Sequence, residues 1–172
     1  MSERLDVGAL LRQLHEAGIE HILIGGLAVN AWGVIRSTKD IDICPSPDRE
    51  NLERLAGLLR RLGVRQLGVG IEGFREPEMP FDPTRAEDLV KGGNFRLATP
   101  LGILDIMQWV PGIDADNTYG TLAADAERAM AFGIEIRVCS LDALRLMKRA
   151  AGRPRDLLDL ADLDRAHASQ SS

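Results

Sequence analysis

The chain has 172 residues, of which 45% are apolar and 4% are aromatic, and its formal net charge is −5. This length is enough for one domain with a substantial core. The scarcity of aromatic side chains argues against a broad stacking surface for single-stranded nucleic acid, and the acidic balance argues against a surface coated with basic patches. No apolar run reaches membrane-spanning length and MSERLDVG lacks a signal-peptide pattern, so we expect a cytoplasmic protein without a membrane partner.

Helices and strands alternate in the first part of the predicted chain. Val7, Leu10, Leu11 and Leu14 recur at helical spacing, and HILI before Gly25 has the composition of a buried strand. The predicted elements are a helix over 7–17, a strand over 21–24, a short helix over 27–32, a strand over 41–44 and a helix over 48–62.

Prolines and glycines divide the rest of the chain into shorter predicted elements. The predicted elements are a strand over 64–71, a loop over 70–83, a short helix over 85–90, strands over 94–98 and 103–107, a loop over 112–120, a hairpin of 128–132 with 134–139, a helix over 140–150 and a last helix from 154 to about 166.

Cys44 and Cys139 each lie in an apolar, strand-like segment, and they have no metal-type spacing. We expect both to be buried free thiols, which fits a cytoplasmic protein.

Two aspartates interrupt the apolar strand predicted over 41–44. Side chains two residues apart on a strand point the same way, so Asp40 and Asp42 project together while Ile41 and Ile43 face the opposite side. Two carboxylates this close repel each other. The repulsion is relieved either by a divalent cation such as Mg²⁺ between them or by protonation of one of them.

Gly25 and Gly26 join a strand to a helix. Such a turn brings bare backbone close to a ligand and aims helix N–H groups at it, which suits a phosphate group. A glycine turn followed by paired carboxylates therefore suits a nucleoside triphosphate bound with Mg²⁺.

Asp105 is the candidate for a third carboxylate. Two-metal chemistry usually recruits a further acid, and Asp105 lies between Leu104 and Ile106 in an otherwise apolar strand. If that strand neighbours the Asp40 strand, Asp105 joins the same cluster. The alternative is an aspartate on an exposed strand face.

The segment GGLAVNAWGVIRSTKDIDI, residues 25–43, resembles the signature of the DNA polymerase beta-type nucleotidyltransferase superfamily. In that superfamily a glycine turn precedes a D-x-D strand, and a third aspartate arrives on a later strand. The form is closest to the AbiEii-like bacterial branch of type IV toxins, whose later lysine and D-x-x-D helix match Lys148, Asp156 and Asp159 in MKRAAGRPRDLLDL.

The resemblance extends over residues 19–163 and implies an α/β (α+β) nucleotidyltransferase fold, with a mixed β-sheet flanked by helices. It implies a core over 1–139, a pair of helices over 140–168 that completes the same domain, and a disordered tail over 169–172. The implied reaction moves a nucleoside monophosphate from an NTP to a hydroxyl acceptor and releases pyrophosphate.

The resemblance also assigns the catalytic roles, with two Mg²⁺ ions as cofactors. Asp40 and Asp42 would bind both ions. Asp105 would bind the ion near the acceptor hydroxyl and act as, or assist, a general base. Lys148 would contact phosphate and offset developing negative charge, although a solvated helix position is the alternative for this residue.

The remaining implied residues belong to the nucleotide site. Gly25 and Gly26 would hold the triphosphate, and Arg36 and Thr38 would touch phosphate or shape the turn. Asp156 would position the lysine rather than react. The alternative for Asp156 is a first-turn charge that complements the last helix.

Two tryptophans and a basic run are further candidates. Trp32 is expected to pack in the core, whereas Trp109, before Pro111 and Gly112, is the better candidate for stacking on a base. The run of basic residues within 145–155 could bind RNA or triphosphate, yet cations are also favourable near a helix C-terminus.

The sequence leaves the acceptor open. A tRNA or other RNA end is the first expectation, followed by a hydroxyl of a partner protein and by a small molecule, which in this superfamily usually goes with a larger helical domain. Only residues 140–172 follow the hairpin, so we expect either minimal base recognition or a second subunit, in a homodimer or a partner protein, that supplies it. The alternative to an enzyme is a catalytically idle nucleotide-binding or interaction module.

Overall fold

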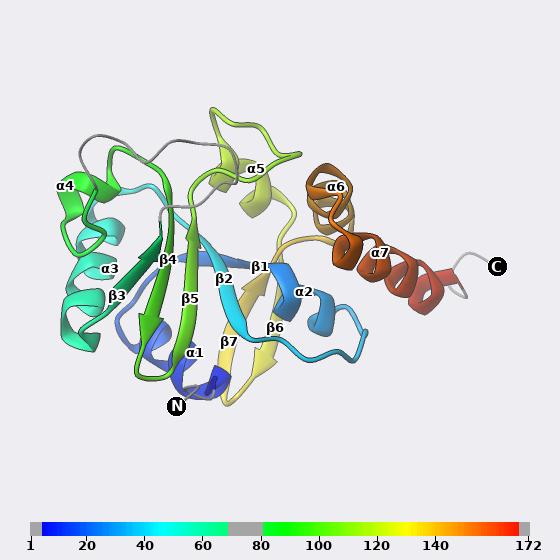
Figure 1. Cartoon of the computed structure of the whole chain (residues 1–172), viewed down its shortest axis with the longest axis horizontal. Coiled ribbons are helices and arrows are strands. Elements are labelled where there is room, and N and C mark those ends of the chain that lie inside the picture. The colour runs from blue at the N-terminus through cyan, green and yellow to red at the C-terminus, as the bar shows by residue number, and fades with distance from the viewer. Residues whose placement is uncertain (1–4, 69–80, 169–172) are drawn as a thin grey trace.

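Seven strands form one mixed sheet in the order β3-β4-β5-β2-β1-β7-β6 (Figure 1). The structure is a computed structural model that describes residues 5–68 and 81–168. The β1–β7 and β2–β5 pairs are parallel, and the other neighbours are antiparallel. The strands are β1 (His21–Ile24), β2 (Asp40–Pro45), β3 (Arg65–Gly68), β4 (Asn94–Thr99), β5 (Gly102–Met107), β6 (Glu127–Ala131) and β7 (Ile134–Val138).

The helices begin and end at recognisable capping residues. The side chains of Asp6, Asp48 and Ser140 each accept a hydrogen bond from a backbone N–H in the first turn of the helix that follows. Gly63 and Gly152 end two helices in the left-handed conformation. The helices are α1 (Val7–Glu16), α2 (Gly25–Ala31), α3 (Arg49–Leu62), α4 (Ala86–Leu89), α5 (Thr118–Ala124), α6 (Leu141–Ala151) and α7 (Pro154–His167).

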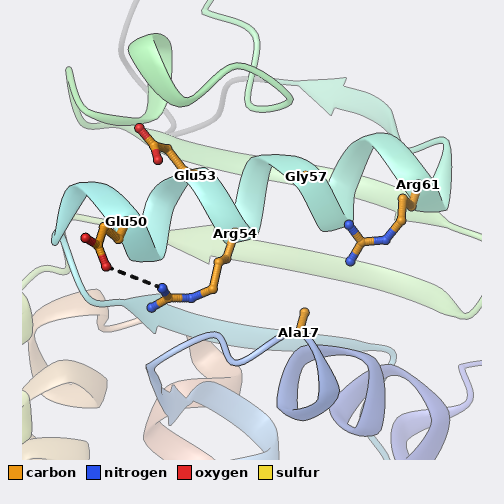
Figure 2. A pocket seen from close by; sticks show the side chains of 6 residues that line it. All are labelled: Ala17, Glu50, Glu53, Arg54, Gly57 and Arg61. Atoms are coloured by element: carbon orange, nitrogen blue, oxygen red, sulfur yellow. Dashed lines mark ion pairs between the residues drawn. The ribbon is translucent and has the colours of Figure 1, made fainter.

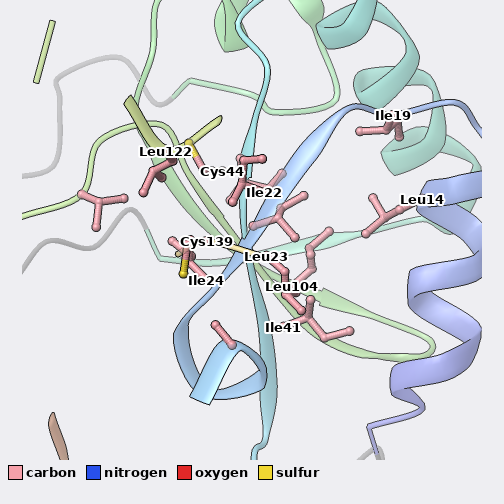
Figure 3. Packing of buried hydrophobic residues seen from close by; sticks show 14 of the residues in the cluster. Leu14, Ile19, Ile22, Leu23, Ile24, Ile41, Cys44, Leu104, Leu122 and Cys139 are labelled. Atoms are coloured by element: carbon pink, nitrogen blue, oxygen red, sulfur yellow. The ribbon is translucent and has the colours of Figure 1, made fainter. Parts of the chain in front are cut away.

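Apolar side chains pack on both sides of the central strands. Figure 3 shows Leu14 and Ile19 on one side of the strands and Leu122 of α5 on the other. Ile41 and Leu104 are fully buried, and burial of such side chains is the main favourable term in folding. The core therefore fixes β2 and β5 side by side.

The two C-terminal helices pack against each other, and α6 also contacts α2 (Figure 1). This arrangement brings a segment that is distant in sequence next to the glycine turn. It confirms the predicted fold class, a mixed sheet flanked by helices with a C-terminal helical pair.

Two predicted boundaries were wrong. The short helix predicted over 27–32 begins at Gly25, because the positive φ of that glycine lets the chain leave β1 and enter the helix within one residue. The predicted loop over 112–120 contains the start of α5, whose buried residues are Thr118 and Leu122, too few to give a clear apolar periodicity.

Several other predictions are now resolved within the described residues. Cys44 and Cys139 are buried free thiols, as expected. Trp32 is partly buried against the core, and its indole N–H donates to the carbonyl of Cys139.

Most of the predicted loop over 70–83, the end of the strand predicted over 64–71 and the tail over 169–172 lie outside the described residues. In the described part of the chain, none of the helices combines the length and apolar character needed to cross a bilayer.

Candidate functional site

Three carboxylates that are distant in sequence meet on the central strands. Because β2 and β5 are parallel neighbours, Asp42 lies opposite Asp105, and Asp40 lies opposite Ile103. One carboxylate oxygen from each of Asp40, Asp42 and Asp105 lies within 4.8 Å of the others. The predicted convergence of the three acids is therefore what the structure shows.

Burial and mutual repulsion make these carboxylates difficult to ionise together. Burial, followed by repulsion from Asp105 and Asp40, raises the pKa of Asp42 to about 8. Burial also raises the pKa of Asp105 to about 6, although the positive charge of Arg96 opposes that shift. Acids with such shifted pKa values cluster at functional sites.

The trio fits a hard divalent cation. Each aspartate offers an oxygen ligand, and Mg²⁺ prefers oxygen ligands. A bound cation would remove the repulsion that now favours protonation. The donor set on β2 and β5 therefore has the chemistry of a Mg²⁺ or Mn²⁺ site.

Arg96 on β4 is a member of this cluster that the sequence analysis missed. Its Nη1 donates to Asp105 Oδ2 at 2.6 Å, and its Nη2 donates to Asp40 Oδ2 at 3.1 Å. The signal was present in the sequence, because a tight turn between Thr99 and Gly102 sets the β4–β5 register and places Arg96 opposite Asp105. The site therefore contains a built-in cation between its acids.

The glycine turn lies directly against the carboxylates. A side chain at Gly25 would overlap the Asp42 carboxylate, since a Cβ built there falls on Asp42 Oδ2. A Cβ at Gly26 would lie 2.9 Å from Thr38 Oγ1 and 3.3 Å from Arg36 Nη2. The absence of side chains at Gly25 and Gly26 thus allows Asp42 and the loop before β2 to lie close to the backbone of the glycine turn.

The loop after α2 is held at both ends. Asn30 donates from its amide to the carbonyls of Val34 and Arg36, and Arg155 of α7 donates to the carbonyl of Ser37. The hydroxyl of Thr38 donates to the backbone carbonyl of Asp40, at the start of β2. Thr38 therefore shapes the entry into the D-x-D strand, one of the two roles expected of it.

The last two helices contribute a buried ionic network. Lys148 Nζ lies 3.1 Å from Asp156 Oδ1 and 2.8 Å from Asp159 Oδ2, with 9% of its side chain exposed. Asp159 also accepts from Arg36 at 2.6 Å. The solvated alternative for Lys148 was therefore wrong, because α7 covers it with two acids.

Asp156 links this network to the start of α7. It accepts from the backbone N–H and from Nε of Arg153, which closes a capping box at the helix N-terminus. Burial tends to raise the pKa of Asp156, but hydrogen bonds from Arg153 and Lys148 outweigh it, and the net pKa is lowered. Asp156 thus both starts the helix and holds Lys148, so the two readings of its role were complementary.

Two features remain separate from this cluster. Trp109, two residues beyond β5, is partly buried, and Asn94 holds its backbone N–H and carbonyl; its role in stacking stays a prediction. A shallow surface pocket lies on α3 and the end of α1, where Glu50 pairs with Arg54 (Figure 2). None of the residues that line this pocket belongs to the acidic cluster or to the network around Lys148.

No protein-family model and no curated protein matches the chain. Solved structures do match. One is a lincosamide antibiotic adenylyltransferase, LnuA, with lincomycin bound, which is 16% identical with a TM-score of 0.60 over 94% of this chain and 98% of its own.

Two matches are structures of the antibiotic-resistance factor ANT(2'')-Ia. The solution structure is 20% identical with a TM-score of 0.51 over 94% of this chain and 80% of its own. The crystal structure with adenylyl-2''-tobramycin is 17% identical with a TM-score of 0.52 over 94% and 87%. The chain therefore has the fold of nucleotidyltransferases.

Proposed function

We propose that this chain is a divalent-metal-dependent nucleotidyltransferase, which moves a nucleoside monophosphate from an NTP to a hydroxyl acceptor. The observation that carries the proposal is the meeting of Asp40, Asp42 and Asp105 beside a glycine turn, on a fold that solved adenylyltransferases share. Fold alone does not define function, so the argument depends on the chemistry of these residues.

Asp40 and Asp42 would bind two Mg²⁺ ions, and Asp105 would share one of them. Ions held there would bring the acceptor oxygen and the phosphates together and offset their charge. The acceptor oxygen forms a bond to the α-phosphorus, the bond from that phosphorus to the oxygen bridging to the β-phosphate breaks, and pyrophosphate leaves. Asp105, whose carboxylate belongs to the trio, would take the hydroxyl proton as the general base.

The cationic side chains around the glycines would hold the triphosphate. Arg36 lies against Gly26, and its Nε is buried without a hydrogen-bond partner among the described residues. Lys148 is joined to Arg36 through Asp159, so both cations are positioned by the same helix. Phosphate oxygens would supply the additional acceptors that these groups can use.

We propose a small-molecule hydroxyl as the first acceptor class to test. The three solved structures above are of antibiotic-modifying or antibiotic-resistance proteins, and this chain spans nearly the whole length of one of them. From the sequence, an RNA end was the first expectation, and a small-molecule acceptor was expected to go with a larger helical domain. An RNA end and a partner-protein hydroxyl stay in the test as other acceptors, and a toxic role of the AbiEii-like type stays a prediction.

The test is transfer of label from α-labelled NTPs with Mg²⁺, offered in parallel to lincosamides, aminoglycosides, total tRNA and a bacterial lysate. We expect labelled acceptor with the wild type and at least a hundredfold less with Asp42→Asn, whereas the exposed Asp116→Asn serves as the matched control and keeps full activity. Binding of Mg-NTP without transfer to any acceptor would instead indicate an idle nucleotide-binding module. Failure to bind any NTP with Mg²⁺ would refute the proposal.

A further inference from the structure

Arg96 lies inside the acidic cluster on β2 and β5. Its two terminal nitrogens bind one oxygen of Asp105 and one of Asp40, which are carboxylates from different strands. A guanidinium has five donors in a rigid fork, so it can bridge two acids in this way. The same two aspartates belong to the trio that would bind a divalent cation.

A guanidinium and a divalent cation compete for these aspartates. Asp105 Oδ2 already accepts a short, charge-assisted hydrogen bond of 2.6 Å from Arg96, and Asp40 Oδ2 accepts a longer one of 3.1 Å. A metal ion that binds the same carboxylates has to loosen these bonds, and it has to approach a positive charge that lies within hydrogen-bond distance of its ligands.

We propose that Arg96 is a positioning residue, an internal counter-ion that holds Asp40 and Asp105 together until a divalent cation displaces it. This inference rests on the metal site of the proposed function and adds a regulatory element to it. Arg96 relieves the repulsion among the acids when no metal is present, and it lowers the affinity for metal alone.

The environment of Arg96 fits displacement better than a permanent structural pair. Its side chain is 45% exposed, so the guanidinium can move into solvent or toward an anionic ligand, whereas Asp105 is buried with 10% of its side chain exposed. A freed guanidinium next to the metal site is also well placed to meet a polyphosphate. Displacement by the metal would therefore prepare the site for the nucleotide.

The test measures the affinity of the protein for Mn²⁺ in the absence of nucleotide, after bound metal has been removed with EDTA. Free Mn²⁺ is followed by electron paramagnetic resonance, and unfolding temperatures are recorded for the metal-free samples. Arg96→Met removes both the charge and the fork while retaining much of the apolar stem. The matched control is Arg128→Met on β6, which removes an exposed arginine paired with Glu135 on the neighbouring strand.

We expect Arg96→Met to bind Mn²⁺ about tenfold more tightly than the wild type, because a unit charge a few ångströms from a divalent ion changes affinity by roughly that factor even in high dielectric. We also expect its metal-free form to unfold at a lower temperature, since the acids lose their counter-ion. Arg128→Met should leave Mn²⁺ affinity unchanged, and it should lower the unfolding temperature of the metal-free protein less than Arg96→Met does.

A merely structural arginine would lower stability without raising metal affinity. Equal or weaker Mn²⁺ binding by Arg96→Met therefore overturns the inference, and if wild type still binds Mn²⁺ the proposed function stands. If neither protein binds Mn²⁺, the proposed metal site fails and the inference fails with it. Should Arg96→Met not fold, the neutral but hydrogen-bonding Arg96→Gln replaces it with the same expected rise.

Discussion

Among the described residues, Asp159 is the acid that joins Arg36 to Lys148, and its replacement by asparagine is the sharpest test of the network on α7. The carboxylate is 4% exposed, and it accepts from Arg36 at 2.6 Å and lies 2.8 Å from Lys148 Nζ. Removing the charge leaves two largely buried cations. Lys148 keeps Asp156, whereas Arg36 has no other acidic partner among the ion pairs of the described residues.

The expected loss is about 3 kcal/mol, the lower end of the range for breaking a buried ion pair, because the asparagine carbonyl can still accept one hydrogen bond. For a domain of this length that corresponds to a fall in unfolding temperature of roughly 6–12 °C. Urea unfolding and calorimetry of the nucleotide-free protein measure the two quantities. Nucleotide affinity should fall as well, since both cations lose their common anchor.

The matched control lies on the same helix. Asp164→Asn removes a carboxylate that pairs with Arg145 at 3.1 Å but has 61% of its side chain exposed. Exposed pairs contribute less than about 1 kcal/mol and are screened by salt. Equal losses for Asp159→Asn and Asp164→Asn, or a loss for Asp159→Asn that disappears in 1 M NaCl, would show that the network is not structural in the way argued.

Three further predictions follow from the site and its support. The pKa values of Asp42, about 8, and Asp105, about 6, lie above the ordinary 3.8, so the stabilising contribution of these two groups is fully present below about pH 3.8 and is lost as pH rises through 6 and 8. Unfolding without metal should therefore become easier between about pH 5 and 8, while Mn²⁺ affinity rises over the same range with release of protons measurable by calorimetry; a flat profile contradicts this. Gly25→Ala should weaken Mn²⁺ binding, because the new methyl group would overlap the Asp42 carboxylate. The control is Gly63→Ala, since Gly63 has a similar positive φ but open space around it. This control should cost only about 1–2 kcal/mol of backbone strain and leave Mn²⁺ binding unchanged. Asn51→Ala should lower the free energy of unfolding by about 2–4 kcal/mol, measured in urea, because this buried amide makes hydrogen bonds that tie α3 to the start of β1 and the end of β2. A loss below about 1 kcal/mol would contradict that role.

The acidic trio could be predicted because strand geometry is local. Alternation along β2 places Asp40 and Asp42 on one face, and an isolated aspartate between Leu104 and Ile106 has few reasons to be there unless it joins other groups. These are properties of a few neighbouring residues. The remaining condition is that β5 lies beside β2, which the buried Ile41 and Ile43 of β2 and Leu104 and Ile106 of β5 favour.

Arg96 and Lys148 were harder because their partners are set by tertiary structure. Arg96 pairs across two strand boundaries, and only the register of β4 with β5 and of β5 with β2 brings it to both acids. Lys148 belongs to a basic run that is otherwise typical of a solvated helix end, and its burial depends on where α7 packs. Charge patterns alone do not distinguish a buried cation with acids from a solvated one.

The charged side chains of the site form two halves, and each half contains both acids and cations. Arg96 neutralises part of the charge on the sheet carboxylates, and the acids of α7 neutralise the cations that face the glycine turn. This pairing matters because an unpaired buried charge is costly. A metal ion alone meets the opposition of Arg96, and a triphosphate alone meets the charge of the sheet acids beside Gly25. A metal–nucleotide complex satisfies both halves at once, since it presents positive charge to the acids and negative charge to the cations. Under the proposed function, we expect the site to bind the metal–nucleotide complex more tightly than either component alone, because acids and bases lie side by side in it.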